Sequence, residues 1–170
     1  ERAINVLTTV LEDLKQEPMV RHEAAEALGA IGSPEVLELL KKYKSDPIVE
    51  VSETCELALE RIQWLQSKEN LKLSENPFYS VDPAPPIDIE DVNKLKEILL
   101  DDKQSLFQRY RAMFSLRNLK SKDAIEALCG ALQHGSALFR HEIAFVLGQL
   151  QHEASVPALK TSLEDTTENE

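Results

Sequence analysis

Residues 20–31 read Val-Arg-His-Glu-Ala-Ala-Glu-Ala-Leu-Gly-Ala-Ile, and residues 139–150 read Phe-Arg-His-Glu-Ile-Ala-Phe-Val-Leu-Gly-Gln-Leu. Both segments carry Arg-His-Glu followed, five residues after the glutamate, by Leu-Gly. Their apolar residues recur at the spacing of a helix. The predicted inward faces are Val20, Ala24, Ala27, Leu28 and Ile31 in one segment and Phe139, Ile143, Val146, Leu147 and Leu150 in the other. The His-Glu pair falls off this stripe each time, so burial of the stripe does not explain it.

The helical pattern returns along the chain with a period near 31 residues. A shift of 31 aligns Arg109 with Arg140 and Leu28 with Leu59. A period of this length with two helical segments per unit is typical of an α-solenoid. The sequence therefore predicts an all-α fold, an α-solenoid of short, HEAT-like helical-hairpin repeats.

Proline and glycine divide the chain into its elements. We expect Pro18 to open a helix, Gly32 to end it and Ser33 to act as the next N-cap. Helices are expected at residues 2–14, 18–31, 34–43, 47–66, 89–100, 104–119, 122–133, 137–150 and 153–164. Residues 67–88 contain Pro77, Pro83, Pro85 and Pro86 and resist helix formation. The predicted organisation is HEAT-like repeats over 1–66, a Pro-rich linker over 67–88 and further repeats over 89–170.

Composition limits the partners. The 170 residues carry a net charge of -11, which argues against general nucleic-acid binding. This charge suits a basic partner, or it serves only solubility. Two cysteines without a disulfide framework favour a reducing compartment, the cytoplasm. No apolar run reaches the ~18 residues of a membrane span.

A second repeat, with an offset of 152 residues, relates the two ends of the chain. It aligns residues 1–13 with residues 153–165. The first residue is not methionine. We therefore expect a chain truncated at both ends, with a counterpart of each His-Glu pair outside it and with apolar end faces that self-associate.

The two His-Glu pairs are the candidate functional residues. Histidine and glutamate are usual ligands of non-haem iron, manganese and zinc. Neighbouring residues on a helix point about 100° apart, so one pair cannot enclose an ion and other helices must complete the site. The alternative is a solvated helix face. Glu53-Thr54 and Tyr110-Arg111 stand at the same position of other repeats, so the repeat fold itself does not require His-Glu. His152-Glu153 lies in a turn and is interpreted as surface or helix-capping.

Several stretches resemble one family closely, the deoxyhypusine hydroxylases. They are residues 18–32, the linker residues 79–86, residues 109–114 and residues 139–153. The likeness covers essentially the whole chain, and a generic HEAT scaffold would not share the linker.

The resemblance implies an enzyme that uses two irons and O2 to hydroxylate the deoxyhypusine side chain of translation initiation factor 5A. It implies four His-Glu motifs, of which His22-Glu23 and His141-Glu142 match two. These four residues would then be metal ligands, with Glu23 and Glu142 either on iron or holding the substrate amine. A chain with two of the four motifs is expected to be inactive alone. The alternative function is a non-catalytic HEAT-repeat scaffold that binds a protein.

Overall fold

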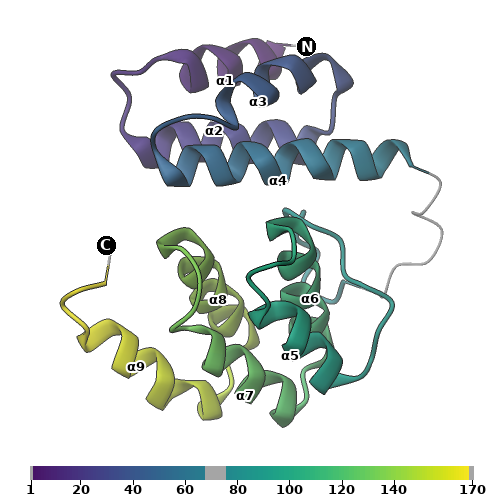
Figure 1. Cartoon of the computed structure of the whole chain (residues 1–170), viewed down its shortest axis with the longest axis vertical. Coiled ribbons are helices and arrows are strands. Elements are labelled where there is room, and N and C mark those ends of the chain that lie inside the picture. Colours follow the sequence, from purple (N-terminus) through teal and green to yellow (C-terminus); the bar gives the residue numbers. More distant parts are fainter. Residues whose placement is uncertain (1, 68–75, 169–170) are drawn as a thin grey trace. The chain divides into compact units, whose positions relative to one another are not determined.

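The computed structural model describes residues 2–67 and 76–168 (Figure 1). All regular elements in these residues are helical, which confirms the all-α prediction. The described residues form two compact units. The first unit contains residues 2–67 and 81–84, and the second contains residues 76–80 and 85–168.

The first unit is built from two helical hairpins. It contains α1 (Arg2–Glu12), α2 (Pro18–Ile31), a 3-10 turn η1 (Pro34–Val36), α3 (Leu37–Tyr43) and α4 (Val49–Gln66). α2 packs against both α1 and α4, and α3 packs against α4. Figure 1 shows α1 and α3 as one layer and α2 and α4 as the other. The core between them includes Ile4, Leu11, Ala24, Ala25, Leu28, Leu40, Val51, Cys55, Ala58 and Ile62.

A glycine sets the distance between α2 and α4. A methyl group at Gly29 would lie 2.7 Å from the Ala58 Cβ and 2.9 Å from the Ala58 Cα. The helices therefore meet almost backbone to backbone at this point. This contact explains why α2 tolerates glycine in its interior, where it costs about 1 kcal/mol relative to alanine.

The second unit repeats the hairpin arrangement. It contains α5 (Val92–Leu100), α6 (Leu106–Leu119), α7 (Lys122–Ala131), α8 (Ala137–Leu150), a 3-10 turn η2 (Glu153–Ser155) and α9 (Val156–Glu164). α6 packs against α5, α7 and α8, and α7 also packs against α9. Buried residues of this unit include Leu95, Leu99, Tyr110, Met113, Phe114, Leu128, Phe139, Ile143 and Leu147.

Caps and turns account for the differences from the predicted helix bounds. The first helix ends at Glu12, because the Asp13 carboxylate accepts a bond from the Lys15 N–H at 3.0 Å. Leu14, at the end of the predicted helix, lies beyond α1 and is 73% exposed. Gly32 ends α2 in the left-handed region, at φ 74°, as predicted. Ser33 occupies the N-cap position of η1, as predicted, but its side chain makes no capping hydrogen bond.

Helices that were expected to start earlier start at a capping side chain. Asp91 accepts bonds from the N–H groups of Asn93 and Lys94 at the start of α5. Ser105 accepts from the Gln108 N–H at the start of α6. Each cap satisfies backbone donors that have no partner within the helix.

The Pro-rich segment is held by helix side chains. In the first unit, the Arg61 Nε donates to the Asp82 carbonyl at 3.0 Å. In the second unit, the Arg111 Nε donates to the Pro85 carbonyl at 3.1 Å, and the Ile87 N–H donates to the Ser115 hydroxyl at 2.8 Å. Residues 68–75 of the predicted linker lie outside the described residues, and the boundaries at 66 and 89 stay a prediction.

The search for membrane-spanning helices covered residues 2–67 and 76–168. None of the helices there combines the length and the apolar character needed to cross a bilayer.

Candidate metal-binding site

The first His-Glu pair lies in the second turn of α2. His22 is buried, with 3% of its surface exposed, whereas the Glu23 side chain is 72% exposed. The prediction that both residues fall off the buried face is therefore wrong for His22. The predicted stripe is wrong in part as well, because Val20 and Ile31 are 44% and 47% exposed. α2 buries residues toward two neighbours, α1 and α4, and His22 lies on the side of α4.

Arg21 joins separate parts of the first unit. Its Nε donates to the Leu11 carbonyl at 2.9 Å, and its guanidinium contacts the Asp46 carboxylate at 2.6 Å. Both side chains are at least 96% buried. Arg21 is thus a structural residue that ties the start of α2 to the end of α1 and to the turn at Asp46.

His22 is held from α4. Its Nδ1 lies 2.6 Å from the Thr54 hydroxyl, and that hydroxyl donates to the Glu50 carbonyl one turn earlier in α4 at 2.7 Å. Thr54 is 3% exposed. The imidazole ring is therefore fixed in a contact between two helices that is closed to water.

The other ring nitrogen of His22 lies among carboxylates. The Nε2 is 3.6 Å from the Glu26 carboxylate and 3.9 Å from that of Glu23. Burial raises the pKa of Glu26, and the nearby charges of Glu23 and Asp82 raise it further. Position 26 was not predicted as a site residue, although it follows His22 by the four residues that put two side chains on one helix face.

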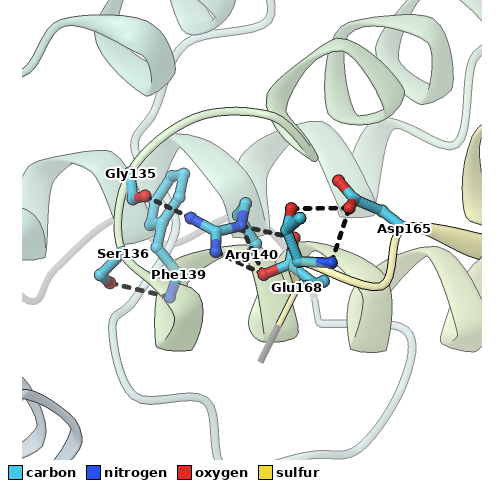
Figure 2. Close-up of polar contacts among 7 residues, drawn as sticks. Gly135, Ser136, Phe139, Arg140, Asp165 and Glu168 are labelled. Carbon is cyan, nitrogen blue, oxygen red and sulfur yellow. Dashed lines mark hydrogen bonds and ion pairs between the residues drawn. The ribbon is translucent and has the colours of Figure 1, made fainter. Parts of the chain in front are cut away.

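The second His-Glu pair lies at the equivalent place on α8, but here the glutamate is buried and the histidine is exposed. Glu142 is 8% exposed, whereas His141 is exposed. Arg140 before it does not repeat the contacts of Arg21. Figure 2 shows its guanidinium between the Gly135 carbonyl, at 2.6 Å, and the Glu168 carboxylate, which its Nε contacts at 2.9 Å. The same tripeptide thus presents a buried histidine on α2 and a buried glutamate on α8.

The two pairs lie in different units, each of which is described by itself. Imidazole nitrogen with carboxylate oxygen is a donor set that non-haem iron accepts, so the residue types at His22, Glu23 and Glu26 fit that metal. Within residues 2–67 and 76–168, no group of three or more His, Cys, Asp and Glu side chains is arranged to hold an ion. Further donors are needed around each pair.

His152 acts as a cap. Its Nδ1 accepts a hydrogen bond from the Ala154 N–H at 3.1 Å at the start of η2. This confirms the capping interpretation of His152-Glu153.

Comparison with known proteins places the fold. HEAT repeats match residues 1–60 and 92–170. The chain belongs to the HEAT-repeat family. The chain is 61% identical to mouse deoxyhypusine hydroxylase over 168 residues, which are 99% of this chain and 56% of the mouse protein. The deoxyhypusine hydroxylase of Drosophila melanogaster is 58% identical over 170 residues, again 99% of this chain and 56% of that protein.

A solved structure agrees with these relatives. Human deoxyhypusine hydroxylase in complex with glycerol superposes with a TM-score of 0.93 at 59% identity, covering 99% of this chain and 58% of the human chain. The resemblance stated from the sequence is confirmed. The HEAT-repeat chain spans a little over half the length of these relatives.

Proposed function

We propose that this HEAT-repeat chain is part of a deoxyhypusine hydroxylase, a monooxygenase that completes hypusine on translation initiation factor 5A. The observation that carries the proposal is the identity of about 60% with deoxyhypusine hydroxylases along 99% of the chain. A HEAT scaffold with another function would not be expected to match them across both its helices and its Pro-rich segment.

The proposed metal ligands are His22, Glu23, His141 and Glu142, and the proposed metal is iron. Two irons, when bound, supply the activation of O2 that attack on an unactivated C–H bond requires. The protein residues orient the substrate and exclude water from the reacting carbon. Glu23 and Glu142 either bind iron or hold the substrate amine. The carboxylates of Glu23 and Glu26 beside His22 make the local charge negative, which favours a cationic amine.

The partners follow from the same proposal. They are O2 and the deoxyhypusine form of translation initiation factor 5A, in the cytoplasm. Two free thiols, Cys55 and Cys129, agree with a reducing compartment. Large apolar side chains are exposed in each unit, among them Val6 and Ile31 in the first and Phe145 and Leu163 in the second. These surfaces support self-association of the chain or its pairing with further repeats.

Iron analysis tests the proposal. We expect the chain alone, loaded with Fe(II) without oxygen, to bind fewer than two irons, because two His-Glu pairs are half of the predicted donor set. Two irons in a monomer of this chain would contradict that expectation. A full-length protein that contains this segment should bind two irons and hydroxylate deoxyhypusine.

Substitutions separate the metal site from a structural role. His22→Ala and His141→Ala in the full-length protein should remove iron while leaving the circular dichroism spectrum unchanged. His134→Ala is the matched control, because His134 is exposed and lies outside both pairs. Iron content that stays the same in both His-Glu variants would overturn the metal site and favour the scaffold.

A further inference from the structure

We propose that Thr54 is a positioning residue of the metal site, which holds His22 in the tautomer that offers Nε2 to the metal. The inference rests on the proposed function for the identity of the metal. The orientation of the ring itself follows from the hydrogen bonds of two helices.

The proposed direction of the bonds follows from the two neighbours of the Thr54 hydroxyl. A threonine hydroxyl has one proton to donate and two lone pairs to accept with. The Glu50 carbonyl, 2.7 Å from the Thr54 Oγ1, can only accept, so it takes the hydroxyl proton. With the hydroxyl proton on that carbonyl, the Thr54 oxygen accepts from the His22 Nδ1 at 2.6 Å, and this is the direction that the proposal assigns. In a neutral imidazole with Nδ1–H, the lone pair is on Nε2.

The surroundings fix this arrangement. His22 and Thr54 are both 3% exposed, so water does not compete for either group. Two turns further along α2, the contact between Gly29 and Ala58 keeps α2 and α4 close together. Nε2 faces the edge where Glu23 and Glu26 lie, at 3.9 Å and 3.6 Å. A ligand histidine that donates its other N–H to a neighbouring oxygen is the usual arrangement in metal sites.

A purely structural role for Thr54 is the competing explanation. Threonine in a helix often returns its hydroxyl proton to the carbonyl four residues earlier, and Thr9 does so with the Asn5 carbonyl at 2.9 Å. Thr9 is exposed, and its hydroxyl donates to that carbonyl. Thr9→Val is therefore a matched control for the loss of one helix hydroxyl without loss of a histidine contact.

Nitrogen NMR of the metal-free chain tests the tautomer directly. The chain has four histidines, so the ring signals of His22 can be assigned with the His22→Gln variant. At about pH 8, above the ordinary pKa of histidine, we expect protonated Nδ1 and unprotonated Nε2 in the wild type, in Thr54→Ser and in Thr9→Val. Thr54→Val should shift His22 toward the other tautomer or a mixture. Nε2–H in the wild type, or an unchanged tautomer in folded Thr54→Val, would overturn the proposal.

Titration with Co(II), read from its visible absorption, tests the consequence for the metal in the full-length protein that contains this chain. We expect Thr54→Val to weaken binding about 10- to 100-fold, the usual effect of removing such a partner, and Thr54→Ser to stay near the wild type. Equal affinity in Thr54→Val and the wild type would refute the positioning role. A wild type that binds no Co(II) but shows the expected tautomer would instead contradict the proposed function and leave the Thr54–His22 assignment in place.

Discussion

The close approach of α2 and α4 at Gly29 gives a sharp test of the packing. Gly29→Ala adds a methyl group 2.7 Å from the Ala58 Cβ and 2.9 Å from the Ala58 Cα. The Cα belongs to the backbone and cannot rotate away, so the two helices must move apart. Overpacking of this kind costs typically about 1–3 kcal/mol. Because the clash involves a backbone atom, we expect the free energy of unfolding to fall by about 3 kcal/mol, at the upper end of that range.

The helix itself gains from the same change. Replacing an interior glycine with alanine favours the helical state by about 1 kcal/mol. The net effect of Gly29→Ala is therefore a loss of about 2 kcal/mol. Gly148 is the matched control, because it occupies the equivalent position of α8 and a methyl group there meets no atom within 4 Å. Gly148→Ala should stabilise the second unit by about 1 kcal/mol.

Two measurements follow these changes in each unit. Trp64, the only tryptophan, lies in α4 and reports urea unfolding of the first unit. Hydrogen exchange of peptides from α4 and α8 reports both units in one experiment. A Gly29→Ala protein as stable as the wild type would refute the close contact. Since the same displacement separates His22 from Thr54, the His22 tautomer should also lose its preference in this variant.

Asp46→Asn leaves the buried Arg21 guanidinium without its carboxylate and should lower the free energy of unfolding by about 3 kcal/mol, measured by urea unfolding with Trp64 fluorescence. Asp165→Asn, in the equivalent but exposed turn, should lower it by less, and equal losses in the two variants would contradict the role of burial. Burial alone raises the pKa of Asp46, but the bonds from Arg21 and the Ile48 N–H hold that pKa below its ordinary value of 3.8, so this stability is present above pH 3.8 and is lost as the pH falls through the folded-state pKa. Burial raises the pKa of the Cys55 thiol to about 12. Iodoacetamide should therefore label the half-buried Cys129 first and Cys55 only on unfolding, as measured by mass spectrometry, and early labelling of Cys55 would contradict its burial. Arg117 is fully buried and donates hydrogen bonds to Asn76 and Gln149. Arg117→Ala should lower the free energy of unfolding by about 3 kcal/mol and raise the hydrogen-exchange rate of residues 76–80. Unchanged protection of these residues would show that Arg117 does not hold that segment.

Local signals in the sequence were sufficient for the helices. Pro18 starts α2 and Gly32 ends it, as predicted, since each residue acts on its own backbone conformation. The faces of the helices were harder to predict. A single apolar stripe assumes one buried side, but α2 packs against both α1 and α4, so His22 became buried and Val20 stayed exposed. The burial of Glu142 in place of His141 likewise depends on the neighbours of α8, which the tripeptide does not encode.

Thr54 could have been found from the sequence by counting along the solenoid. In a repeat array each repeat contacts its neighbours, so equivalent positions of successive helices in one layer, such as α2 and α4, lie side by side. Hydrogen bonds within the described part of the chain join residues 32 positions apart, among them His22 with Thr54, Arg61 with the Gly29 carbonyl, and Arg117 with Gln149. The partner of a candidate ligand should therefore be sought one period away rather than beside it in sequence. Glu53-Thr54 in place of His-Glu shows that the repeat does not require the motif. The same two residues follow His22 by one period, where a hydroxyl can accept the imidazole proton and a second histidine is not needed.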